Sequence, residues 1–142
     1  GEFYINLTTE ALAFATDYCG VKSGKDLNKF EEMHLTPEIG MLSWAPMIKE
    51  SPVCIACEVV RIEELGSHDM FIANVKGVYA DEVYMDEKGK FDLIKAKPIV
   101  YSHGQYYGLG RYIGKFGYSV QKNPAKVKKA SVHKTKANNK KA

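Results

Sequence analysis

Residues 53–79, which read VCIACEVVRIEELGSHDMFIANVKGVY, hold the two longest β-type patterns of the chain. An extended run with alternating apolar positions occupies residues 53–65, and a second run follows over 70–79. The Gly-Ser pair at 66–67 between them is typical of a tight turn. The stretch therefore predicts an antiparallel hairpin. Because both runs are long and partly apolar on both faces, the pattern favours a barrel over a flat sheet.

Side chains two residues apart on a strand share a face of the sheet. We therefore expect one face of the second run to carry four side chains, Phe71, Ala73, Val75 and Tyr79. Lys76 alternates with them and marks a more polar opposite face.

Weaker patterns place short elements before and after the hairpin. They predict a strand over residues 3–7, a helix capped by Thr8 and ended by Gly20, a second helix from an Asp26 cap to His34, an irregular loop over 36–51, a strand over 99–101 and helical spacing over 106–116. The fold class that results is mainly β with short helices (α+β).

Charge divides the chain near residue 120. Eight of the 20 basic residues are lysines in the segment 121–142, where no Asp or Glu occurs, whereas residues 1–120 carry 12 basic and 17 acidic side chains. We expect one folded domain over residues 1–120 and a disordered, Lys-rich tail over 121–142. The tail has no Arg and no aromatic residue, which argues against a nucleic-acid-binding arm.

The cysteines Cys19, Cys54 and Cys57 are odd in number, which favours reduced thiols and a cytoplasmic protein. Cys54 and Cys57 lie three apart on a predicted strand, so their side chains should point to opposite faces and serve packing rather than metal binding or redox exchange. No apolar stretch is long enough to span a membrane, so we expect no membrane association.

Two segments carry polar groups suited to a ligand. Lys22–Asp26 (KSGKD) precedes a predicted helix with Lys29 one turn inside it. A hydroxyl, several ammonium groups and the N–H groups of a helix start suit an anion such as phosphate, although Asp26 as a plain cap and solvated lysines are the alternative. At the hairpin turn, His68 can donate to a ring carbonyl, or it can simply face solvent.

Five blocks of sequence occur in order and at consistent spacing over residues 1 to about 119. They are DYCGVKSGKD at 17–26 with Lys29-Phe30, LGSHDMFI at 65–72, KPIVY at 97–101, YYGLG at 106–110 and GKFGYS at 114–119. Together they resemble the flavin reductase-like, FMN-binding split-barrel family of the flavoredoxin type.

The resemblance implies a split β-barrel of Greek-key type that is incomplete at its N-terminus here, since family members begin with strands ahead of Gly1. It also implies a homodimer with FMN near the subunit interface. Lys29 would contact the flavin or its phosphate, His68 would lie at the isoalloxazine and Tyr101 would pack near the ring. Ser23 is a further expected contact. No catalytic acid or base is assigned.

The function that this resemblance implies is electron transfer between FMN and a reduced nicotinamide (NADH or NADPH) or a redox protein. A non-catalytic flavin-binding electron carrier is the alternative, and a nucleic-acid-associated protein acting through the tail is a third. We expect the 142-residue chain alone to bind FMN weakly or not at all, because part of the barrel would be missing.

Overall fold

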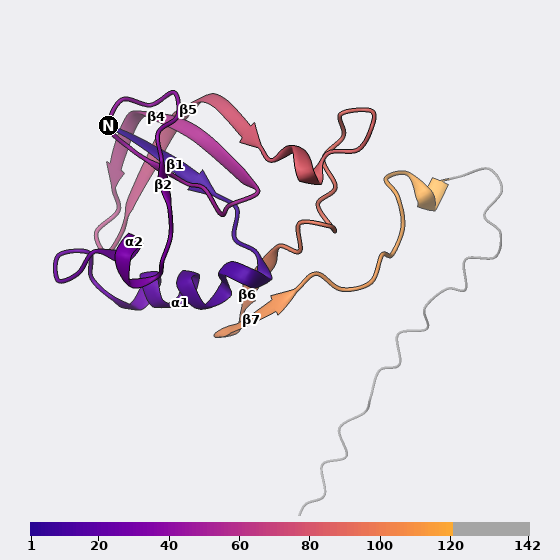
Figure 1. The fold of residues 1–142 in the computed structure, drawn as a ribbon, viewed down its shortest axis with the longest axis horizontal. Helices are drawn as coiled ribbons and strands as arrows, with labels where there is room; N and C mark the ends of the chain where they lie inside the picture. The colour runs from indigo at the N-terminus through magenta and orange to yellow at the C-terminus, as the bar shows by residue number, and fades with distance from the viewer. Residues whose placement is uncertain (121–142) are drawn as a thin grey trace, which may run out of the picture. The chain divides into compact units, whose positions relative to one another are not determined.

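The computed structural model describes residues 1–120, which fall into a larger unit over Gly1–Gly110 and a short part beyond it. The larger unit is built on an antiparallel sheet with the strand order β1-β4-β5 (Figure 1). Its strands are β1 (Glu2–Asn6), β4 (Val53–Glu64) and β5 (Asp69–Ala80). The predicted hairpin is therefore confirmed as β4 and β5, and the predicted tail over 121–142 lies outside the described residues.

The remaining elements are short, and their bounds differ in places from the prediction. They are η1 (Glu10–Leu12), α1 (Ala13–Val21), α2 (Lys29–Glu32), β2 (Pro37–Glu38), β3 (Met47–Ile48), η2 (Glu82–Tyr84), β6 (Ile99–Ser102), β7 (Gln105–Gly108) and, in the short part, η3 (Tyr118–Val120). No helix within residues 1–120 has the length and apolar character needed to cross a membrane.

The helical spacing over 106–116 was misleading, because residues 105–108 form β7 and pair with β6. His103 and Gly104 connect the two strands, and both have positive φ, 51° and 77°. Two central residues with positive φ give a turn whose twist matches a β-hairpin. This turn, together with the strand-favouring Tyr106-Tyr107 pair, outweighs the helical period.

The predicted start of the second helix was also wrong. α2 begins at Lys29, and the side chain of Asn28 caps it by accepting a hydrogen bond from the N–H of Phe30 at 3.2 Å. Asp26 instead belongs to the turn before the helix, where its N–H donates to the carbonyl of Ser23. The helix is only four residues long.

Tyr79 does not share a face with Val75. Ala56 pairs with Gly77, whereas the next residue, Cys57, pairs with Val75, so Lys76 is an extra residue in β5. An extra residue reverses the alternation of the strand beyond it. Tyr79 therefore lies opposite Cys54 on the other face of the sheet.

One face of the sheet is covered by the segment over residues 39–48. Alternate side chains of β1 hold it: the carboxylate of Glu2 accepts from the N–H groups of Trp44 and Ala45, the hydroxyl of Tyr4 accepts from Leu42, and the Asn6 side chain accepts from Ile48. A small core lies beneath this segment, and its buried apolar side chains are Leu42, Met47, Cys54 and Ala56.

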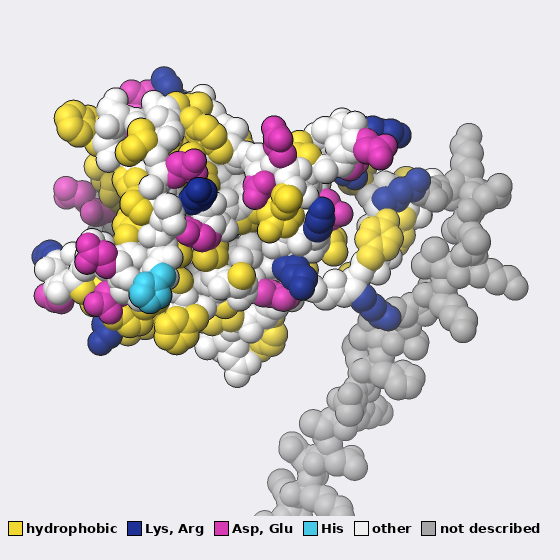
Figure 2. Space-filling view, in the orientation of Figure 1, with side chains coloured by type: hydrophobic (Ala, Val, Ile, Leu, Met, Phe, Trp, Pro, Cys, Tyr) yellow, Lys and Arg dark blue, Asp and Glu magenta, His cyan; other side chains and the backbone are white. Residues whose placement is uncertain are grey.

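The other face of the sheet remains largely exposed. Val75 is 62% and Val78 58% exposed on β5, and Ile5 on β1 is 52% exposed. Figure 2 likewise shows apolar side chains reaching the surface at many places. Within residues 1–110, β1 and β5 are the two edges of this sheet. Within the described residues, the sheet of β1, β4 and β5 therefore has one face covered by the segment 39–48 and one face without a covering layer.

The turn between β6 and β7 provides a test of stability. His103→Asn should raise the free energy of unfolding by about 0.5 kcal/mol, because asparagine tolerates positive φ better than histidine in this type of turn. His103→Val should lower the free energy of unfolding, since a β-branched side chain is strained there. Urea unfolding of both variants measures the difference, and equal stability would contradict the assigned turn geometry.

Candidate functional site

Lys29 lies at the point where α1 ends and α2 begins. Its Nζ donates a hydrogen bond to the carbonyl oxygen of Cys19, in the last turn of α1. The last carbonyls of a helix have no partner inside it, and a cation is favourable there. The stem of Lys29 lies over the loop between the helices, because a Cβ added at Gly24 would be 3.8 Å from Lys29 Cε.

The loop that Lys29 covers also carries Ser23. The hydroxyl oxygen of Ser23 accepts a hydrogen bond from the N–H of Lys25 at 3.2 Å, and both residues are exposed. With Lys22 nearby in the chain, this segment offers a hydroxyl and three ammonium groups. Because α2 has only four residues, it supplies no appreciable dipole, so anion binding here would depend on side chains.

The third predicted residue, Tyr101, lies on β6 directly opposite Tyr106 on β7. The two ring centroids are 5.1 Å apart and the ring planes are tilted by 58°. This distance lies in the range at which aromatic pairs attract each other. Tyr101 is 66% exposed, whereas Tyr106 is 37% exposed, so the ring of Tyr101 has the surface that is open to a ligand.

Asp17 is in the middle of α1, and Tyr106 is on β7. Loss of water around the phenol raises the pKa of Tyr106, and the negative charge of the Asp17 carboxylate raises this pKa further. Two residues later, the Cys19 carbonyl binds Lys29. Helix α1 therefore carries both the carbonyl that binds Lys29 and the carboxylate whose charge acts on Tyr106.

The β6–β7 hairpin is attached to the segment that leads into α1. The N–H of Glu10 donates to the carbonyl of Lys97 at 2.9 Å, and that of Ile99 donates to Thr8 at 3.2 Å. A Cβ added at Gly108 would meet the carboxylate of Glu10, so a larger residue there would require the flexible Glu10 side chain to move. These contacts fix the base of the hairpin beside η1.

His68 lies elsewhere, at the tip of the β4–β5 hairpin. Its Nδ1 is 2.9 Å from the hydroxyl of Ser67, and its carbonyl accepts from the N–H of Leu65. Within residues 1–120, no hydrogen bond, ion pair or aromatic contact joins His68 to Lys29 or Tyr101. Its role at a flavin therefore stays a prediction.

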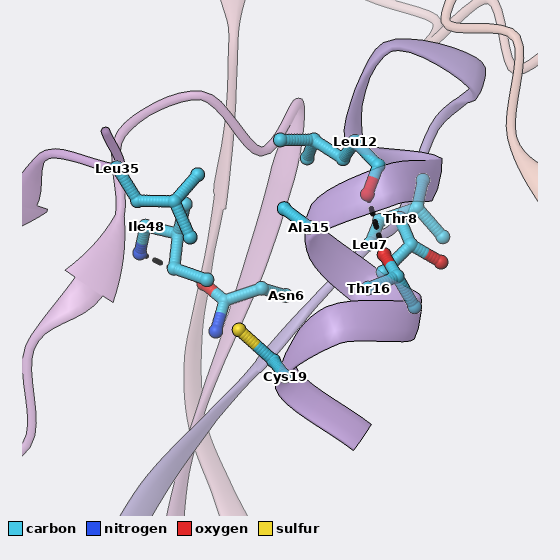
Figure 3. Close-up of a pocket in the computed structure, with 9 residues that line it drawn as sticks. All are labelled: Asn6, Leu7, Thr8, Leu12, Ala15, Thr16, Cys19, Leu35 and Ile48. Atoms are coloured by element: carbon cyan, nitrogen blue, oxygen red, sulfur yellow. Dashed lines mark hydrogen bonds between the residues drawn. The ribbon is translucent and has the colours of Figure 1, made fainter. Parts of the chain in front are cut away.

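A cavity of about 250 Å³ opens between α1, the end of β1 and β3 (Figure 3). Its lining is mostly apolar and consists of Asn6, Leu7, Thr8, Leu12, Ala15, Thr16, Cys19, Leu35 and Ile48. Two of its polar groups are already paired, since the Thr16 hydroxyl donates to Leu12 and Asn6 accepts from Ile48. None of the four predicted site residues lines it.

The cysteines behave as the sequence predicts. All three thiols are free, Cys54 and Cys57 are buried, and their Sγ atoms contact different backbone carbonyls. The part of the chain that the structure describes contains no group of three metal-ligating side chains.

Thiol labelling tests this burial. Burial raises the pKa of the Cys54 thiol, so less thiolate is present at any pH near neutrality. At pH 8, iodoacetamide should modify the half-buried Cys19 first and Cys54 at least about tenfold more slowly. Peptide mass spectrometry measures both rates, and equal rates would contradict the burial of Cys54.

Asp17 is the site residue that the sequence interpretation missed. Its charge acts on Tyr106, which is far from it in the sequence, so local pattern gives no sign of this pair.

Comparison with known proteins agrees with this architecture. Residues 1–110 match the flavin reductase like domain. The flavoredoxin of Desulfovibrio vulgaris (Miyazaki F) is 28% identical with a TM-score of 0.74, and that of Methanosarcina acetivorans is 30% identical with a TM-score of 0.73. In both cases the similarity covers 83% of this chain and 64% of the flavoredoxin.

A structure from Shewanella frigidimarina, described as a flavin reductase with a split barrel domain, has a TM-score of 0.68 at 24% identity. The similarity covers 81% of this chain and 59% of that one, and it shows the same fold. The chain spans about half the length of the curated relatives it matches. On the match over residues 1–110, this chain belongs to the flavin reductase-like domain family and has its mainly β, split-barrel type of fold.

Proposed function

We propose that this protein binds FMN and transfers electrons between the flavin and a reduced nicotinamide or a redox protein. The observation that supports this most is that the described residues offer both an ammonium group, that of Lys29 over the Ser23 loop, and an exposed aromatic ring, that of Tyr101 paired with Tyr106. FMN has two parts that suit these groups. Its anionic phosphate suits the ammonium group, and its flat aromatic ring system suits the tyrosine. The flavin supplies the redox chemistry when bound, and the protein binds and orients it.

The donor groups of the loop suit a phosphate. Lys29 brings a positive charge to the loop, and the Ser23 hydroxyl has a proton to donate, since its oxygen only accepts in the described contacts. Charge-assisted hydrogen bonds are the strong ones in phosphate recognition. We assign Lys29 and Ser23 to the phosphate side of the site.

The ring side of the site is assigned to Tyr101 and His68. Tyr101 offers an exposed aromatic surface, and its ring is oriented by Tyr106. His68 is exposed on a hairpin tip, where its Nε2, which has no partner in the described contacts, can donate to a flavin carbonyl. Neither residue needs to act as an acid or base for electrons to move through the flavin.

The site is proposed for the protein at its natural length and as a homodimer. Support comes from the uncovered sheet face with Val75 and Val78 and from the two open sheet edges of residues 1–110. Exposed apolar surface of this kind is normally covered by further structure or a partner. The three free thiols support a reducing compartment, and we propose the cytoplasm.

Spectroscopy of the natural-length protein tests the proposal. We expect non-covalent flavin that is released by heat and identified as FMN by mass spectrometry. Adding NADH or NADPH anaerobically should bleach the flavin band. Bleaching only by a chemical reductant would favour the electron-carrier alternative, and a protein that neither retains nor binds FMN would refute the proposal.

A further inference from the structure

We propose that the outer face of α1 is the surface through which two copies of this chain associate, with their α1 helices antiparallel about a two-fold axis. The inference rests on the homodimer of the proposed function, and it adds which surface forms that dimer. It does not depend on the flavin chemistry.

Helix α1 is apolar along most of its length, yet none of its residues is buried. Its inner side faces the sheet, where Leu12 and Cys19 line the cavity of about 250 Å³. Its outer side carries a stripe of apolar side chains, of which Phe14 and Val21 are each 75% exposed. Apolar surface on the outer side of a helix is normally covered by another element. The stripe consists of Ala11, Phe14, Tyr18 and Val21.

A helix from a second copy fits this stripe better than a further strand does. Further strands would attach to the open sheet edges at β1 and β5, because strands need backbone partners. A helix offers no such partners along its side, since its backbone bonds lie within it. The intervals of three, four and three residues in the stripe are those of a seam between two packed helices.

The stripe is also suited to two-fold symmetry. When two copies of α1 pack antiparallel, Ala11 faces Val21 of the second copy, and Phe14 faces Tyr18 of the second copy. Within one copy, the rings of Phe14 and Tyr18 stack with their centroids 6.4 Å apart and their planes 21° from parallel. The axis would therefore bring the aromatic pairs of both copies together at the centre of the interface.

A hollow of about 520 Å³ beside α1 gives the second copy a place to pack. It lies along residues 11–15, and its apolar wall includes Phe14, Met33 and Leu35. In the antiparallel arrangement, the C-terminal end of the second α1 lies over this half of the helix. Val21 of the second copy is then the side chain that enters the hollow.

The charges beside α1 agree with the antiparallel arrangement. Glu32 is exposed at the hollow beside the first half of α1, whereas Lys22 and Lys25 are exposed just beyond its C-terminal end. Both ion pairs found within residues 1–120 lie on β4 and β5, so neither uses these three charges. Antiparallel packing brings the lysines of each copy to Glu32 of the other, whereas parallel packing would place like charges together.

Sedimentation velocity of the natural-length protein tests the surface. Phe14→Glu places a charge at the centre of the interface, and the dissociation constant of the dimer should rise at least about a hundredfold. Val83→Glu is the matched control, because Val83 is also exposed, at 59%, and lies on η2, away from α1. It should leave the dissociation constant unchanged.

A charge exchange tests the orientation and serves also if Phe14→Glu does not fold. Lys22→Glu and Glu32→Lys should each raise the dissociation constant about tenfold, because each places like charges opposite one another. The double variant restores the pairing with the signs exchanged, so its dissociation constant should return to within about twofold of the wild type.

The outcomes separate this inference from the proposed function. A dimer that persists in Phe14→Glu, or charge variants whose effects simply add, would overturn the α1 interface and leave the homodimer and the flavin site standing. A monomeric wild type in which Phe14→Glu lowers the Tm would also overturn it, because further residues of the same chain would then cover α1. A dimer that dissociates in Phe14→Glu supports the interface even if the wild type binds no FMN.

Discussion

Replacing Lys29 by alanine should weaken FMN binding ten- to a hundredfold in the natural-length protein. If Lys29 makes a charge-assisted hydrogen bond to the phosphate, its loss costs about 1.5–3 kcal/mol of binding free energy. Titration of FMN fluorescence measures the change. Lys29→Arg should recover only part of the affinity, because a planar guanidinium occupies different space from a compact ammonium.

Lys25→Ala is the matched control, since Lys25 lies in the same loop and only its backbone N–H makes a described contact. It should change the affinity less than twofold. Lys29→Ala also removes the hydrogen bond to Cys19, so its Tm should fall slightly as the end of α1 loses a partner. If Lys29→Ala lowers the Tm but leaves the FMN affinity unchanged, Lys29 only stabilises the C-terminal end of α1 and does not bind FMN.

Replacing His68 by alanine should affect the flavin itself more than its binding. A group that donates a hydrogen bond to the ring stabilises electron density there, so its loss shifts the reduction potential and the absorption band. The rate of flavin reduction by NADH or NADPH should fall by about five- to tenfold, equivalent to one hydrogen bond of about 1–1.4 kcal/mol. Stopped-flow absorbance measures the rate.

His34→Asn is the control for this variant, because His34 is also exposed and its positive φ of 52° suits asparagine. It should leave the reduction rate and the flavin spectrum unchanged. If His68→Ala and His34→Asn have the same reduction rate and flavin spectrum, His68 does not contact the flavin ring.

The sequence is sufficient for those elements that depend on local pattern. The β4–β5 hairpin follows from two long runs around Gly66-Ser67, and α1 follows from helical spacing that ends near Gly20. The extra residue at Lys76 is not predictable in this way, because local periodicity contains no sign of it. The extra residue adjoins Gly77, over which Met41 from the segment 39–48 packs. We therefore attribute the extra residue to tertiary packing.

The candidate site is predictable only in part, for the same reason. Lys29 and Ser23 come from one short segment whose chemistry is visible in the sequence. The position of the β6–β7 hairpin relative to the start of α1 depends on contacts between segments about 90 residues apart, such as the backbone hydrogen bonds of Glu10 with Lys97 and of Ile99 with Thr8. Resemblance to a family suggested Tyr101, whereas its pairing with Tyr106 emerged only from the structure.

The most direct test of the flavin-binding account is the affinity of the natural-length protein for FMN relative to riboflavin, measured in the wild type and in Lys29→Ala. The two ligands share the ring system and differ by the phosphate. Wild type should prefer FMN by at least about tenfold, and Lys29→Ala should lose most of that preference while binding riboflavin as before. A wild type that binds neither ligand, or a preference for FMN that survives in Lys29→Ala, would contradict the account.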